Sequence, residues 1–287
     1  MTPDSLAKDV TKLAALPAVY YRVSQMLDDP GSTTADVAQV VAQDPALTGR
    51  LLSVVNTAYY GFPSRITNIP MAVTILGARG LRDLLLTVSV SSALRHLDTD
   101  VLDLEGYWHH SIRCGLMARG LGNHIGYRDP ESLFIAGLLH DLGKLAIYHR
   151  LQEESRQILQ RCAEGERPLY RLEREALGFD HCQVGDALLR HWRLPDLYRE
   201  AAAFHHTPDS AARYPLEVSV IHVADALTDK AEPGHVLPRQ AETGLPRLHP
   251  FARAHIMVDM RLAEQLQLEA DLQAIEMQEI LFGSVSP

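Results

Sequence analysis

The sequence predicts an all-α fold, and three observations support this prediction. Apolar residues recur at helical spacing through most of the 287 residues, and no segment shows the period-two alternation of a half-buried strand. Proline and N-capping side chains stand together where helices would begin, and glycine stands where several would end. A hydrophobic content of 46% is enough for one large or two modest helical cores.

The first two helices that we place follow one another closely. Ser32 or Thr33 is the expected N-cap of a helix that extends to Ala42 and gathers three valines on one face. Asp44-Pro45 then supplies an N-cap and a first helical residue for the next helix, and Gly61 is its expected left-handed C-cap. A DNA-reading helix-turn-helix is a minor alternative here, because the pair carries only one arginine.

Two glycines are expected to end the helices that follow. A short helix over 70–76 should stop at Gly77, and a more hydrophobic, buried helix should run over 81–94. The next helix is predicted over 107–121 and should end at Gly122. Glycine ends helices readily because it adopts the left-handed conformation without a steric penalty.

The second half of the chain continues the helical pattern. Asp129 and Pro130 are expected to begin a helix over 131 to about 148. The segment 231–250 is rich in proline, glycine and charge and is predicted as a loop, whereas 252–282 is amphipathic and predicts one or two helices. These would pack on the body, or alternatively serve dimerisation or a partner. The remaining predicted helices are 182–192 capped by Asp180, one capped by Asp196 that ends near Phe204, and 216–230 opened by Pro215.

Histidine is distributed unevenly along the chain. Of the 14 histidines, only His96 precedes a polar break at 97–103. We therefore divide the chain into an N-terminal helical subdomain (1–98), a histidine-rich helical subdomain (99–230), and a loop with C-terminal helices (231–287).

Charge and composition exclude several functions. A net charge of -9 repels phosphate backbones, so we expect no nucleic-acid partner, although a local basic pocket could accept a small phosphorylated ligand. No apolar run reaches 18 residues and the N-terminal apolar stretch carries charges, so neither membrane association nor a secretory leader is expected. Cys114, Cys162 and Cys182 are too scattered for a disulfide framework or a Cys-x-x-Cys site, which favours a reducing cytoplasm.

The segment 137–144 joins an apolar helical face to His140, Asp141 and Lys144. A buried carboxylate needs a cation or hydrogen bonds, so this pair indicates a partner such as a metal ion. Alone the pair is weak evidence. In a two-ion site Asp141 would act as the bridge, and Lys144, one turn beyond His140, would neutralise a substrate phosphate. Asp141 and Lys144 are thus the candidate catalytic residues.

Further polar residues on apolar helix faces strengthen the metal hypothesis. Each also has a structural interpretation: His110 could bond to a carbonyl in the core, His181 could be exposed in a first helical turn, and Asp225 could pair with an arginine. Together they offer nitrogen and carboxylate ligands from several helices, a mixture suited to one or two divalent ions of Fe, Mn or Zn. The full candidate set of metal ligands is His110, His140, Asp141, His181, His205, His206 and Asp225.

In this order the residues resemble the HD superfamily of metal-dependent phosphohydrolases, and most closely its HDOD branch, the HD-related output domain. The resemblance covers roughly residues 10–230. It implies a multi-helix HDOD fold, with an N-terminal helical subdomain packed on an HD-type helical domain, and a role in bacterial signal transduction. The matching segments are 16–19 (LPAV), 44–48 (DPALT), 51–61, 69–73, 76–77, 134–144 and 177–195.

A second likeness begins at His205 and concerns the HD-GYP branch, which hydrolyses cyclic di-GMP. Tyr214-Pro215 falls in register with the end of the motif of that branch. However, Thr207 replaces the glutamate of the motif, and Ala211 and Arg213 replace its glycines. These departures count against a working cyclic di-GMP hydrolase.

The resemblance leaves two functions open. The first is a regulatory or scaffolding output module with a metal-binding HD site, read by a signalling protein partner and compatible with a homodimer. The second is a metal-dependent phosphohydrolase acting on a nucleotide or cyclic dinucleotide. We favour the first, because the resemblance implies a family that has often lost catalysis, commonly through missing ligands. This sequence keeps a full-looking set of ligands, which favours metal binding and leaves turnover open.

Overall fold

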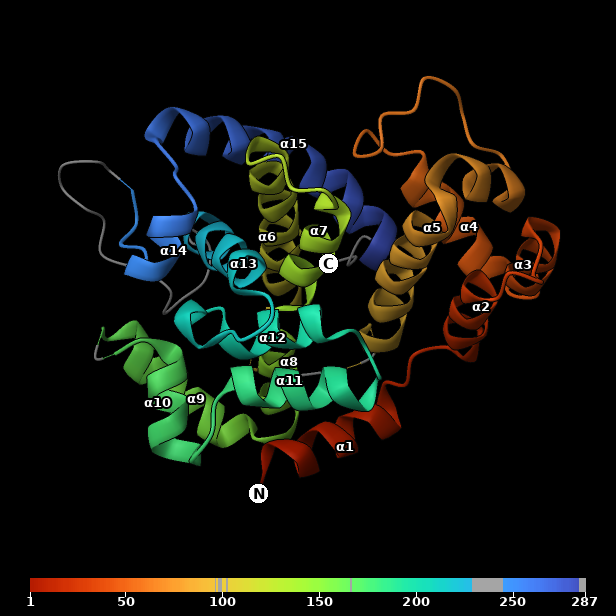
Figure 1. Ribbon diagram of the computed structural model, residues 1–287. Helices are drawn as coiled ribbons and strands as arrows, with labels where there is room; N and C mark the ends of the chain where they lie inside the picture. Colours follow the sequence, from red (N-terminus) through yellow and green to blue (C-terminus); the bar gives the residue numbers. More distant parts are fainter. Residues whose placement is uncertain (96, 98–99, 102, 166, 229–244, 284–287) are drawn as a thin grey trace. The chain divides into compact units, whose positions relative to one another are not determined.

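The computed structural model describes residues 1–95, 97, 100–101, 103–165, 167–228 and 245–283 (Figure 1). The regular elements among these residues are α-helices and one 3₁₀ turn, η1, which confirms the predicted all-α class. None of these helices combines the length and the hydropathy that a membrane span requires. The helices are α1 Pro3–Leu13, α2 Ala18–Asp28, α3 Thr34–Val41, α4 Pro45–Val55, α5 Ile69–Leu94, α6 Leu104–His124, α7 Pro130–Leu139, α8 Leu142–Arg150, α9 Gln152–Ala163, α10 Leu169–Leu177, α11 His181–His191, α12 Asp196–Phe204, η1 Pro208–Ser210, α13 Pro215–Thr228, α14 Pro250–His255 and α15 Met260–Phe282.

The helices group into two compact units that are not continuous in sequence. One unit, which we call the histidine unit, contains Met1–Leu13 and Leu97–Ala274. The other contains α2 to α5 together with the chain from Ile275 on. The first thirteen residues, which belong to the N-terminal subdomain (1–98) in the division predicted from the sequence, group with the histidine unit. The three-part division proposed from the sequence stays a prediction.

Helices α3 and α4 begin where their caps predict. Thr33 accepts a hydrogen bond from the Asp36 backbone N–H, and the Asp36 side chain accepts one from the Thr33 backbone N–H, which completes a capping box. The prediction that Gly61 caps α4 was wrong. The helix ends at Val55, and Asn56 then both donates to and accepts from the Ile66 backbone, at 2.8 Å each.

Gly77 marks a break inside α5. Its backbone has φ 71° and ψ 175°, which separates the short helix predicted over 70–76 from the buried helix predicted over 81–94. A side chain is strained in this conformation, so glycine is required here. The predicted stop was therefore correct in place.

Glycine at 122 does not end α6, which continues to His124; that prediction was wrong. Its role is packing, since a Cβ on Gly122 would collide with the Leu133 side chain of α7. Gly115 and Gly137 act alike, because a Cβ on Gly137 would lie 2.7 Å from Gly115 Cα. Small residues thus allow α6 and α7 to approach closely.

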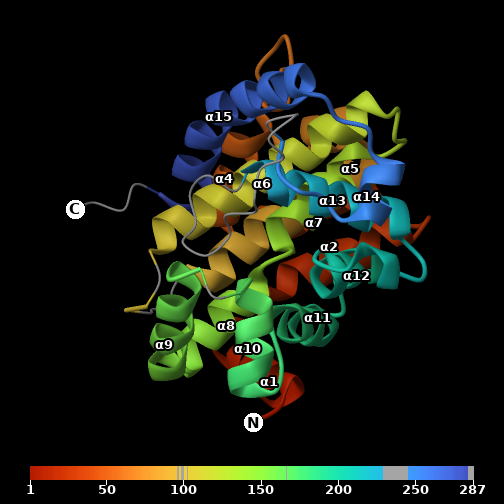
Figure 2. The ribbon, with the colours of Figure 1, turned by 90° about the vertical axis from the view of Figure 1, so that its left-hand side faces the viewer.

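The helix predicted over 131–148 is two helices, α7 and α8, separated at His140-Asp141. Helix α8 approaches α11 closely, and the two lie side by side in Figures 1 and 2. A Cβ on Gly143 would overlap the His181 carbonyl oxygen and lie 2.7 Å from the Gly185 nitrogen. Because these two glycines lack a Cβ, the start of α11 can pack directly against the His140-Asp141 pair.

The N-terminal helix α1 completes the histidine unit. It packs on α11 and α8, and buries Leu6, Ala7 and Val10 there. Asp4 on its exposed side pairs with Arg190 of α11 at 2.9 Å. The packing of this apolar face, more than the exposed ion pair, stabilises the contact.

The remaining helices follow the sequence with small shifts. Asp180 caps α11 through a capping box with Gln183, as expected. Asp196 is the first residue of α12 and not its cap, because Pro195 occupies the cap position. The C-terminal region forms two helices, α14 and α15, as predicted. Most of the predicted loop over 231–250 lies outside the described residues.

Candidate metal centre

The His140-Asp141 pair lies at the junction of α7 and α8, and both side chains are completely buried. His140 Nδ1 lies 2.6 Å from the Gly137 carbonyl oxygen one turn earlier. A carbonyl can only accept, so this nitrogen carries the hydrogen and donates it. The other nitrogen, Nε2, therefore faces Asp141 Oδ2 at 3.2 Å.

His181 is oriented by a buried glutamate of α10. Its Nδ1 lies 2.6 Å from Glu173 Oε2, and its backbone N–H donates to the same oxygen at 2.9 Å. Both side chains are buried. His181 Nε2 then faces Asp141 Oδ1 at 3.5 Å. Glu173 therefore fixes this ring, as outer carboxylates do for histidine ligands in metal sites.

His205 and His206 follow the last residue of α12. The Nδ1 of His205 donates to backbone carbonyls, with the Ala202 oxygen at 3.0 Å, so its Nε2 faces Asp141 Oδ1 at 3.5 Å. His206 is half-buried; its Nε2 lies 3.2 Å from His181 Nε2, and its ring stacks on Tyr170. His205 thus faces the Asp141 carboxylate, whereas His206 faces the His181 ring.

Helices α6 and α13 complete the cluster. His110 Nε2 lies 3.3 Å from Asp225 Oδ1 and 3.8 Å from Asp141 Oδ2. His140 Nε2 is 3.6 Å from the same Asp225 oxygen. The Lys144 ammonium lies 2.6 Å from Asp141 Oδ2 and is 1% exposed. All seven predicted metal-ligand candidates, and Lys144, are therefore brought together in the histidine unit.

The charges of the cluster are coupled through Asp141. Burial would raise the pKa of Asp141, but His140 and Lys144 hold it well below the usual value. Burial opposes a charge on His140, yet Asp141 outweighs it and raises the pKa of His140 well above the usual value; Glu173 does the same for His181. Burial and the His140 charge lower the pKa of His205 well below its usual value. A metal ion at this place would compete with protons for His140 and His181, whereas the lowered pKa of His205 favours its neutral, metal-binding form.

The donor set fits a divalent metal ion. His140 Nε2 and Asp141 Oδ1 are buried and make no hydrogen bond to any residue that the structure describes. The donor atoms form three overlapping groups, and the atoms of each group lie within 4.8 Å of one another. Nitrogen and carboxylate donors of this kind suit Zn, Fe or Mn. The groups are His110, His140 and Asp225; His140, Asp141 and His205; and His181, Cys182, His205 and His206.

Sequence reasoning missed three residues that support the cluster. Glu173 stands in the amphipathic helix LYRLEREAL, where the sequence gives no signal that this one charged residue is buried. His222 of α13 donates from Nδ1 to the His205 carbonyl at 2.7 Å, which holds the end of α12. Cys182 lies beside His205, and burial raises the pKa of its thiol.

A family model named the HDOD domain matches residues 13–208 of this chain. The chain belongs to the HDOD family. An uncharacterised protein of Treponema pallidum (strain Nichols) is 28% identical to it over 240 residues, which cover 82% of this chain and 46% of that protein. The chain therefore spans about half the length of the curated relative that it matches.

Solved structures agree with the fold. An HDOD domain protein of unknown function from Geobacter sulfurreducens has a TM-score of 0.73 at 24% identity, and covers 99% of this chain and 98% of its own. A candidate phosphohydrolase from Shewanella amazonensis SB2B has a TM-score of 0.74 at 26% identity, and covers 96% and 98%. A candidate signal transduction protein from Marinobacter aquaeolei VT8 has a TM-score of 0.69 at 18% identity, and covers 96% and 61%.

Proposed function

We propose that this HDOD protein is a regulatory output module whose histidine-aspartate centre binds one or two divalent ions of Fe, Mn or Zn, and that a signalling protein reads the metal-bound conformation. One observation carries the proposal. Three histidine rings, each fixed through Nδ1, direct Nε2 at the Asp141 carboxylate within 3.5 Å, in a fully buried setting. His110, His140, Asp141, His181, His205, His206 and Asp225 are the proposed ligands.

Burial favours a regulatory role over rapid turnover. Asp141, His140 and Lys144 are at most 1% exposed, so a substrate would reach them only after the surrounding helices opened. A bound ion would supply positive charge and Lewis acidity at this point. The proposed ligands come from α6, α11, α13, the α7–α8 junction and the residues after α12. Metal binding would therefore order these helices relative to one another. A protein partner could then bind the ordered form in preference to the metal-free form.

The experiment compares metal content and helix protection in the purified full chain. Elemental analysis should find Fe, Mn or Zn, and Asp141→Ala should lose it, whereas His124→Ala, which alters an exposed histidine of α6, should keep it. Removal of the metal by a chelator should speed amide exchange in α11 and α12. Exchange in α3 and α4, which carry none of the ligands, serves as the internal control. A protein that takes up no divalent ion would end the proposal.

A metal-dependent phosphohydrolase acting on a nucleotide or cyclic dinucleotide is the second candidate function. It is favoured by the Lys144 ammonium, which lies 2.6 Å from Asp141 Oδ2, and by the name of the Shewanella structure. Lys144 would then bind a substrate phosphate, with Asp141 in the catalytic role. Metal-loaded protein that hydrolyses a nucleotide, with Lys144→Met keeping the metal but losing turnover, would support it. If the metal-loaded protein hydrolyses none of the nucleotides tested, the regulatory role stands and this second function does not.

A further inference from the structure

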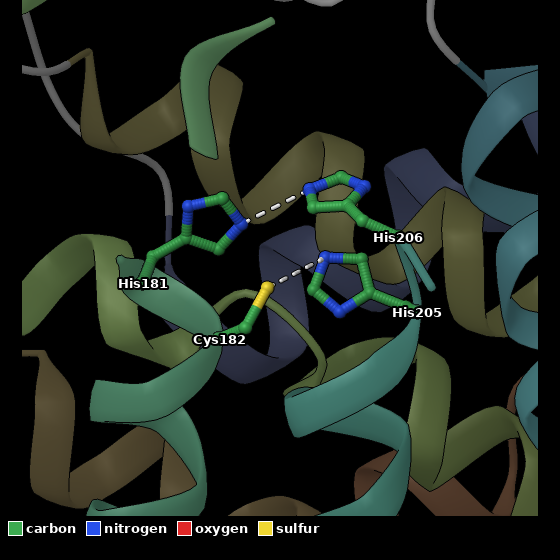
Figure 3. A group of neighbouring side chains, drawn as sticks. All are labelled: His181, Cys182, His205 and His206. Atoms are coloured by element: carbon green, nitrogen blue, oxygen red, sulfur yellow. Dashed lines mark hydrogen bonds between the residues drawn. The ribbon is translucent and has the colours of Figure 1, made fainter. Parts of the chain in front are cut away.

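A sulfur atom lies among three imidazoles of the centre. Cys182 follows His181 in the first turn of α11 and is 2% exposed. Its Sγ lies 4.0 Å from His205 Nε2, and in Figure 3 it points into the space between the His181 and His205 rings. His181, Cys182, His205 and His206 each present one donor atom, all within 4.8 Å of one another.

These spacings are close to those around a tetrahedral ion. With Zn–N of about 2.0 Å and Zn–S of about 2.3 Å, neighbouring donor atoms lie about 3.3–3.6 Å apart. The Nε2 atoms of His181 and His206 are 3.2 Å apart, and Cys182 Sγ is 4.0 Å from His205 Nε2. Small rotations of these side chains would therefore place three nitrogens and one sulfur around one ion.

The two ends of the cluster differ in chemical softness. The group of His110, His140 and Asp225 offers nitrogen and carboxylate oxygen. The group around Cys182 offers nitrogen and sulfur, and thiolate sulfur favours Zn²⁺ over harder ions such as Mn²⁺. The centre therefore contains two unequal half-sites, which we call the oxygen half-site and the sulfur half-site.

We propose that Cys182 Sγ ligates the ion held by His181, His205 and His206, and that this sulfur makes the sulfur half-site selective for a thiophilic divalent ion such as Zn²⁺. This inference rests on the proposed metal-binding function. On binding, the S–H bond breaks, a sulfur–metal bond forms and the proton leaves to solvent, with no change in oxidation state. The competing interpretation is a packed thiol that only donates to His205 Nε2.

Cobalt distinguishes the two, because Co²⁺ bound to thiolate gives a sulfur-to-metal charge-transfer absorption in the near ultraviolet. The metal-free full chain is titrated with Co²⁺ alone. Wild-type protein should develop the band, Cys182→Ser should lose it, and Cys162→Ser, which alters a buried cysteine of α9, should keep it. The wild-type spectrum alone is decisive even if the variant folds poorly: cobalt bound without the band overturns the inference. A band that depends on Cys114 would also overturn it.

Competition between Zn²⁺ and Mn²⁺ measures the selectivity. Cys182→Ser should lower Zn²⁺ affinity by about tenfold or more, since even outer partners of a ligand change affinity about 10- to 100-fold, and should leave Mn²⁺ affinity unchanged. Equal loss for both ions would contradict a sulfur ligand. If Cys182→Ser binds both ions as the wild type does, this inference fails and the proposed function stands. If the wild type binds neither ion, both fail.

Discussion

Gly143 packs so closely on the start of α11 that a methyl group there would overlap the carbonyl oxygen of His181. The backbone of α8 thereby fixes the position of a proposed ligand on another helix. Because packed interiors have little free volume, an added methyl group must push α11 away.

Gly143→Ala should therefore displace His181 from Asp141 and weaken metal binding. We expect at least about a tenfold loss of affinity, comparable to losses on altering ligand-orienting residues. Isothermal titration with Zn²⁺ measures it. Gly49→Ala is the matched control, because a Cβ at Gly49 meets nothing within 4 Å. Unchanged affinity in Gly143→Ala would show that α11 can move without disturbing the centre.

Glu173→Gln should reduce metal affinity by about 10- to 100-fold while the protein stays folded. The amide can accept the His181 N–H but lacks the charge that favours the ring as a strong donor. Glu175→Gln, at an exposed glutamate of the same helix, should bind like the wild type. If the two variants bind metal with equal affinity, Glu173 does not support the metal centre.

Metal affinity should rise with pH. In the metal-free chain, Asp141 raises the pKa of His140 and Glu173 raises that of His181, so protons on these two rings compete with a cation. Raising the pH favours loss of these protons and should strengthen binding. Titrations at several pH values with one metal test this, and an affinity that falls with rising pH would contradict the proton-competition argument.

Gly77→Ala should destabilise the unit that contains α5 without changing metal content. Its backbone lies in a region that only glycine adopts readily, so the substitution should cost about 1–3 kcal/mol of unfolding free energy. Chemical denaturation measures the loss, and elemental analysis checks the metal. Gly49→Ala, inside α4, should be neutral or slightly stabilising. A stable Gly77→Ala protein would indicate that α5 can straighten.

The sequence predicts helix starts better than helix ends. Thr33 and Asp180 begin helices through local hydrogen bonds, which depend only on neighbouring residues. Gly122 was wrongly taken as an end, because its function is contact with α7, and such packing is a tertiary property. The break at His140-Asp141 was also missed, since its apolar flanks continue the helical pattern on both sides.

The same distinction applies to the candidate centre. The order of His140-Asp141, His181 and His205-His206 can be read along the chain, and the structure brings them together. The residues that orient these ligands cannot be identified from the sequence. Glu173 looks like any charged residue of an amphipathic helix, and only the packing of α10 against α11 shows that it is buried.

The position of α1 has a practical consequence for protein production. The family match spans residues 13–208, so a recombinant fragment trimmed to those limits would lack both α1 and α13. It would expose the apolar surface of α11 that Leu6 and Val10 cover, and it would omit Asp225 altogether. If such a fragment is insoluble or binds no metal, the cause would be the missing helices and not the chemistry of the longer chain.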